Sequence, residues 1–171
     1  GESNWVDGFT AKLDEKGTID RNLFGVWSHL RLAPGHHAGP YLLVEQDKNV
    51  GGERLLRLTG GTRFTGSTTG ETGHLFGYDL EGALQTGEEG DQDVFAWMGV
   101  ATVRYHGPSW TQPELRLGVD LYSGDGTAGD GDQGAFDNLF GNRHTFLGFM
   151  DLFKALPNDT DNGGLMDVRL A

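Results

Sequence analysis

Hydrophobic and polar residues alternate with a period of two along most of this chain. The clearest run is PELRLGVDLY, where Leu115, Leu117, Val119 and Leu121 alternate strictly with polar or small residues. Such alternation is typical of a strand with one apolar and one polar face. Less strict alternation occurs within residues 5–13, 23–32, 41–46, 55–64, 75–85, 94–105 and 165–170. The pattern predicts about eight strands without helices between them, and therefore an antiparallel all-β sandwich or barrel.

The connections between these segments differ in charge. DEKGTI, QDKNVGGE, TGEEGDQD and a long loop over about residues 124–164 are acidic, whereas APGHHAGP, TGSTTGETG and HGPSWTQP contain one acidic residue among them. The two kinds alternate along the chain. An up-and-down meander places alternate connections at opposite ends, so we expect one acidic end and one nearly neutral end. This asymmetry is typical of a barrel whose two rims face different media.

The polar faces of the predicted strands are rich in arginine and carboxylates. Facing charges of both signs are typical of the lining of water-filled pores. An ordinary solvated face with cross-strand ion pairs explains the same pattern. The residues that we predict to line a pore are Arg31, Arg57, Arg63, Asp79, Glu81, Arg104, Arg116, Asp120 and Arg169.

Composition excludes several classes of function. With 25 acidic and 13 basic residues the net charge is −12, which repels a phosphate backbone, so we expect no nucleic-acid partner. The absence of cysteine excludes disulfide scaffolds, thiol catalysis and cysteine-ligated zinc. A mean hydropathy of −0.43 does not argue against a membrane, because spanning β-strands are short and half polar. Aromatic residues near the predicted strand ends suit an interfacial girdle, namely Trp5, Trp27, Trp97, Trp110, Tyr41 and Tyr105.

Candidates for metal binding and catalysis are few. The loop SGDGTAGDGDQGAFDN offers four aspartates among glycines as hard oxygen ligands for Ca²⁺, without EF-hand spacing: Asp125, Asp130, Asp132 and Asp137. A hydrated loop is the alternative, and no other cofactor is expected. His36 and His37 are adjacent, so their side chains are expected to point apart rather than share a metal. Glu45, Glu81 and Glu114 are isolated on strands, and no catalytic triplet is evident, so we do not expect an enzyme.

Several motifs occur in an order that resembles a known family. They are EGALQTG with its Gln-x-Gly step, then DVFAW, then PELRLGVDLYSGD, and finally FDNLFGNRHTFLGFMDLF. Together with the opening VDGFTAKLDEKGTIDRNLFGVW, these segments resemble the C-terminal part of the alginate export family of Gram-negative outer-membrane porins. The resemblance covers most of residues 1–171. It implies that these residues form a single segment of a transmembrane β-barrel.

The resemblance implies a hydrophilic channel in a bacterial outer membrane. Its partners would be the lipid bilayer, lipopolysaccharide, and an anionic polysaccharide such as alginate or small anionic solutes, guided by inward arginines. About eight strands are too few for an aqueous channel, so we expect these residues to be part of a larger barrel. The alternative is a soluble carbohydrate-binding β-sandwich, which would bury Leu115, Leu117, Val119 and Leu121 against a second sheet.

Overall fold

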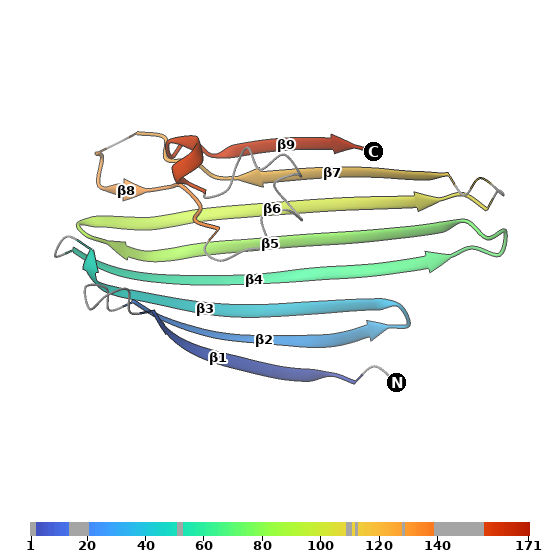
Figure 1. The fold of residues 1–171 in the computed structure, drawn as a ribbon, viewed down its shortest axis with the longest axis horizontal. Helices are drawn as coiled ribbons and strands as arrows, with labels where there is room; N and C mark the ends of the chain where they lie inside the picture. The colour runs from blue at the N-terminus through green and yellow to red at the C-terminus, as the bar shows by residue number, and fades with distance from the viewer. Residues whose placement is uncertain are drawn as a thin grey trace.

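One antiparallel sheet dominates the computed structural model, which describes residues 3–13, 21–50, 53–108, 111, 113–127, 129–138 and 156–171. Its strands are β1 (Trp5–Leu13), β2 (Arg21–Ala33), β3 (His36–Val50), β4 (Glu53–Thr69), β5 (Leu75–Glu89), β6 (Gln92–His106), β7 (Glu114–Tyr122), β8 (Asp132–Gln133) and β9 (Leu165–Leu170). The order across the sheet is β1-β2-β3-β4-β5-β6-β7-β9, and the short β8 pairs with β6 (Figure 1). The predicted antiparallel up-and-down architecture is confirmed, and the sheet is open, as expected for part of a barrel.

Connections alternate between the two ends of the sheet. The β2–β3, β4–β5 and β6–β7 connections lie at one end, and the β3–β4, β5–β6 and β7–β9 connections lie at the other (Figure 1). The second end, which we call the acidic end, carries Glu88, Glu89 and Asp91 around the β5–β6 turn. The long loop predicted over 124–164 corresponds to the β7–β9 connection, which contains β8 and the 3-10 helix η1 (Asn158–Thr160).

No helix among the described residues combines the length and the apolar character needed to cross a membrane.

The pattern predicted β1, β7 and β9 closely, but β3, β4 and β5 are longer than it predicted. His36 to Pro40 were expected to lie in a connection, but they belong to β3, and the β2–β3 turn contains only Pro34 and Gly35. Likewise β4 continues to Thr69, and β5 continues to Glu89. In these three longer strands the alternation marks only the middle, because both faces become polar toward the ends. Pro40 removes one backbone donor, and pairing on either side of it keeps the strand continuous.

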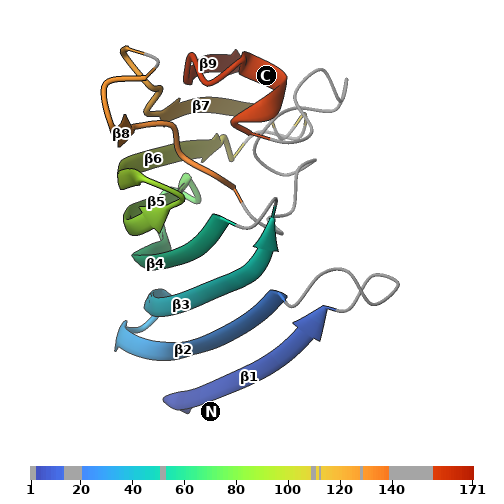
Figure 2. The ribbon, with the colours of Figure 1, turned by 90° about the vertical axis from the view of Figure 1, so that its left-hand side faces the viewer.

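The register divides the side chains into two faces. Residues directly opposite each other in a ladder share a face, and one such row runs through Trp27, Tyr41, Gly61, Ala83, Met98 and Tyr122. We call the face of this row the inner face, because the sheet is curved and residues 134–138 and η1 lie on its concave side (Figure 2). The opposite, convex side is the outer face.

The outer face exposes large hydrophobic side chains on every long strand; on β1 this is Val6, beside Gly8, Thr10 and Lys12. Leu84 is 58% exposed, Phe95 66%, Leu115 52% and Val168 56%. The sandwich alternative requires Leu115 and its neighbours on β7 to be buried by a second sheet, yet the described strands form a single sheet. Exposed apolar area of this extent marks a surface that contacts a partner or a membrane.

Three of the aromatic residues expected in an interfacial girdle, Trp5, Trp27 and Tyr41, lie on the inner face instead. The apolar positions of β1, including Trp5 and Phe9, lie on the inner face, because Asp7 pairs with Trp27 and Phe9 with Gly25. Trp27 and Tyr41 are also inward and lie in the middle of their strands, so they do not belong to an interfacial girdle. Tyr105 fits the girdle, since it lies on the outer face near the end of β6. Trp110 lies outside the described residues.

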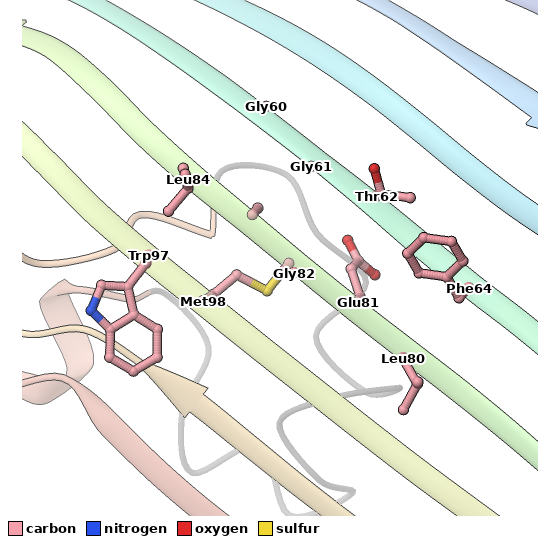
Figure 3. A pocket seen from close by; sticks show the side chains of 11 residues that line it. Gly60, Gly61, Thr62, Phe64, Leu80, Glu81, Gly82, Leu84, Trp97 and Met98 are labelled. Atoms are coloured by element: carbon pink, nitrogen blue, oxygen red, sulfur yellow. The ribbon is translucent and has the colours of Figure 1, made fainter.

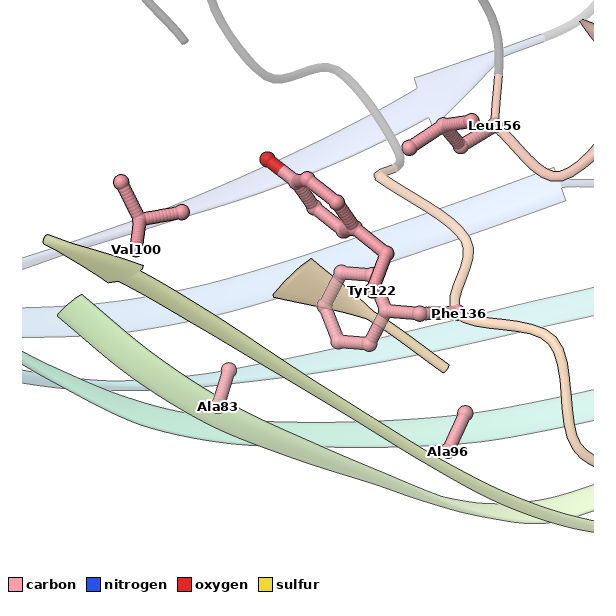
Figure 4. Close-up of a cluster of buried hydrophobic side chains, with 6 residues drawn as sticks. All are labelled: Ala83, Ala96, Val100, Tyr122, Phe136 and Leu156. Carbon is pink, nitrogen blue, oxygen red and sulfur yellow. The ribbon is translucent and has the colours of Figure 1, made fainter. Parts of the chain in front are cut away.

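The buried hydrophobic cluster lies on the inner face. It consists of Ala83, Ala96, Val100, Tyr122, Phe136 and Leu156 (Figure 4). Small side chains on β5 and β6 leave space that Phe136 and Leu156 fill from the β7–β9 connection, and Phe136 contacts Tyr122 with ring centroids 5.9 Å apart. The cluster therefore attaches the β7–β9 connection to the wall of the sheet.

Candidate functional site: the charged inner face

All nine residues predicted to line a pore lie on the inner face. The register places Arg63 opposite Glu81 and Arg104 opposite Arg116, and it places Asp120 beside Arg169. Arg31, Arg57 and Asp79 share this face. Among the described side chains, the strands present nine carboxylates and seven arginines on it. The inner face is therefore densely charged, with a slight excess of negative charge.

Most of these arginines are ion-paired. Arg63 binds Asp79 through two hydrogen bonds, of 2.7 Å from Nε and 2.5 Å from Nη2. Arg169 binds the buried Asp120 at 2.7 Å and also binds Asp167. Arg116 binds Glu114 at 2.8 Å.

Arg31 and Arg104 differ, because neither forms an ion pair with any residue that the structure describes. Five of the seven inner-face arginines are therefore ion-paired within the described part of the chain, and Arg31 and Arg104 are not. The inner face is not a strip of free positive charge.

Arg57 lies at the centre of the most buried ion-pair network. Its Nη1 is 2.6 Å from Asp137 Oδ2 and 3.4 Å from Glu45 Oε2, and its Nη2 is 2.9 Å from Glu89 Oε2. Arg21 binds the same Glu45 from β2. Both Arg57 and Glu45 are buried, so these charges depend on one another for compensation.

Gln85 attaches the β7–β9 connection beside this network. Its Nε2 donates to the backbone carbonyl of Asp137 at 2.7 Å and to Thr59 Oγ1 at 3.1 Å, and its Oε1 accepts from the backbone N–H of Asp137 at 2.9 Å. Gln85 is fully buried. Residues 134–138, which we call the inner segment, are therefore held by Gln85, by the Arg57–Asp137 pair and by the Phe136–Tyr122 contact.

The motifs found in the sequence meet at this point. The Gln-x-Gly step supplies Gln85 and Gly87, where φ is +148° and an added Cβ would lie 1.9 Å from the carbonyl oxygen of Leu56. The strand PELRLGVDLYSGD supplies Asp120 and Tyr122, and the start of FDNLF supplies Phe136 and Asp137. The rest of that last motif, beyond Asn138, lies outside the described residues.

Sequence reasoning missed the roles of Gln85, Glu45 and Asp137. Glu45 was considered for catalysis, and Asp137 for calcium, but both bind Arg57. The available signal was an uncharged glutamine inside an otherwise charged polar face. Its partners could not be identified, since Asp137 is 52 residues away in sequence.

The candidate metal ligands do not form a cluster within the part of the chain that the structure describes. Among the described residues, no group of three or more His, Asp or Glu side chains is arranged to hold a metal ion. Asp130 accepts the backbone N–H of Asp132 at 3.1 Å, and calcium binding by this loop stays a prediction. His36 and His37 point to opposite faces, as predicted: His36 contacts Tyr78 outside, and His37 stacks on His29 inside, with ring centroids 4.6 Å apart.

The outer face has a shallow hollow of about 800 Å³. Gly60 and Gly82 form its floor, and Phe64, Leu80, Leu84 and Trp97 surround it (Figure 3). The two glycines are flanked by large apolar side chains on the same face, so the hollow is suited to hydrocarbon.

Comparison with known families gives one match. A family model described as "Alginate export" matches residues 7–155. Neither the curated proteins nor the solved structures give a match.

Proposed function

Because this chain belongs to the alginate export family, a family of outer-membrane polysaccharide export porins, we propose that its inner face forms part of the wall of an aqueous channel for an anionic polysaccharide. The substrate class is a uronate polymer such as alginate, or smaller anionic solutes. The sheet contributes to a larger barrel that crosses a bacterial outer membrane. The proposal assigns no enzymatic activity to the chain.

The contrast between the two faces of one sheet carries the proposal. Leu80 and Leu84 on β5 are exposed on the outer face, whereas Asp79, Glu81 and Gln85 alternate with them on the inner face. A strand in a membrane channel needs this arrangement, because one side contacts acyl chains and the other contacts water. In the outer leaflet the acyl chains would include those of lipopolysaccharide.

Ion pairing determines how strongly the wall would attract an anionic chain. An arginine that already binds a carboxylate offers less attraction to a passing uronate. Conduction requires binding that is weak enough for release, and paired charges provide that. The two arginines without ion-pair partners in the described part of the wall, Arg31 and Arg104, are then the contacts that favour anions.

Selectivity measurements on the full-length protein in planar bilayers test this assignment. Replacing Arg31 and Arg104 by glutamine is expected to lower the anion-to-cation permeability ratio, because the unpaired positive charges are lost. The matched control is Arg54→Gln, which removes an exposed arginine from the outer face of β4. An unchanged ratio in Arg31→Gln and Arg104→Gln, or an equal change in the control, would contradict the proposal.

A further inference from the structure

We propose that the inner face of β1, β2 and β3 binds the pyranose rings of the transported polysaccharide by stacking. The surface, which we call the aromatic wall, consists of Trp5, Phe9, Trp27, His29, His37 and Tyr41. This inference rests on the proposed function, because it assigns a contact surface within the same channel. It adds a second mode of recognition to the charged pairs of β4 to β9.

The rings form two ladders across neighbouring strands. In the first, Trp5 stacks on His29 with centroids 5.7 Å apart, and His29 stacks on His37 at 4.6 Å. In the second, Phe9 contacts Trp27 at 5.8 Å, and Trp27 lies directly opposite Tyr41. From Trp5 to Phe9 the strand rises about 13 Å, at roughly 3.3 Å per residue. The aromatic wall is therefore longer than a single sugar ring.

Two of these rings, those of Tyr41 and Phe9, lie over glycines on the neighbouring strands. A Cβ at Gly61 would be 2.4 Å from Cζ of Tyr41, so the end of this ring occupies the space above β4. The Tyr41 hydroxyl continues to β5, where it donates to Glu81 Oε1 at 2.7 Å. Phe9 covers Gly25 in the same way, with Cε1 at 2.4 Å. Rings placed in this way cover the wall and leave the lumen open.

The chemistry of the aromatic wall matches a charged sugar. A pyranose ring has an apolar face of C–H groups, which packs on an aromatic ring, and polar groups around its edge. Trp5 is 45% exposed and Phe9 38% exposed, so their faces are accessible from the inner side. Asp7 lies between them, and Arg31 lies at the end of β2 that leads into the β2–β3 turn. These two side chains would be partners for the hydroxyls and carboxylates of the sugar. Among the described inner side chains of β4 to β9, the rings are those of Tyr122, which is buried, and of His106, at the end of β6.

The duration of single-channel block by oligouronates measures how strongly the aromatic wall binds the sugar. In the full-length protein in planar bilayers, oligomannuronate of defined length is expected to interrupt the current, and Trp27→Leu or Phe9→Leu should shorten each interruption by about two- to tenfold. Trp27→Phe should retain the wild-type duration within about twofold, because a ring remains. Open-channel conductance and anion selectivity should be unchanged in all of these variants, since no charge is altered.

The control and the outcomes separate this inference from the proposed function. Phe24→Leu makes the same aromatic-to-aliphatic change on the outer face of β2 and should leave the interruptions unchanged. Wild-type duration in both leucine variants, an equal loss in Phe24→Leu, or a loss in Trp27→Phe as large as in Trp27→Leu would overturn the aromatic wall. A wild-type channel that conducts no ions and is never interrupted by the oligomer would overturn the proposed function itself.

Discussion

At the scale of the residue, the inner face is organised by charges that are buried together. Arg57 and Glu45 would each be costly to bury alone, and the three carboxylates around Arg57 come from β3, β5 and the inner segment. The arginines also differ in their burial and in their ion-pair partners. Arg57 is held on several sides, whereas Arg116 is exposed and binds a carboxylate two residues away on its own strand. Arg57 thus has a structural role, whereas the exposed Arg116 compensates no buried charge among the described residues.

Replacing Arg57 by methionine is expected to destabilise the folded protein by about 3–5 kcal/mol, because Glu45 and Asp137 would lose their buried cation. The matched variant Arg116→Met should have little effect on stability, since water solvates the remaining Glu114. Urea unfolding of the full-length protein in lipid vesicles, followed by tryptophan fluorescence, measures both changes. Equal losses of stability in the two variants would contradict the structural role of Arg57.

At the scale of the element, the inner segment is the part of the β7–β9 connection that is attached to the wall. Residues 134–138 cross the inner face, where Gln85 binds the backbone of Asp137 on both its N–H and its carbonyl. Phe136 fills the space above Ala83 and Ala96. A segment held in this place would narrow the channel at the level of β5 and β6.

Gln85→Ala should release the inner segment and raise its mobility, because both side-chain bonds to Asp137 are lost. This chain contains no cysteine, so Asn138→Cys provides a single position within it for a spin label. We expect broad spectra from the labelled protein and sharper ones when Gln85→Ala is added, with a rise in single-channel conductance. The control is Gln46→Ala, the same change on the outer face of β3. Spectra that do not respond to Gln85→Ala would show that Gln85 does not hold the segment.

At the scale of the whole molecule, a curved sheet separates an apolar surface from a charged one. The fold class, the alternation of connections and the placement of the nine charged residues on one face could be predicted from periodicity, because each depends only on neighbours in sequence. The ends of β3, β4 and β5 could not, since alternation disappears where both faces become polar. Trp5 was expected in a lipid-facing girdle, but it is an aromatic residue on the inner face.

Ion pairing was the largest part of the site that the sequence could not reveal. Arg57 meets Asp137 only because the β7–β9 connection folds back over β5 and β6, and Asp120 meets Arg169 only because β9 pairs with β7. Such pairs depend on the register of distant strands. A count of arginines on the polar face therefore suggested a more positive wall than the structure has.

Thiol accessibility along β6 tests the central claim, that one face of this sheet contacts lipid and the other contacts water. Four consecutive single substitutions by cysteine, at Ala101, Thr102, Val103 and Arg104, sample the two faces in turn. In the full-length protein in bacterial outer membranes, a charged water-soluble thiol reagent is predicted to label positions 102 and 104 and to leave 101 and 103 unlabelled. Equal labelling of all four positions would contradict the account.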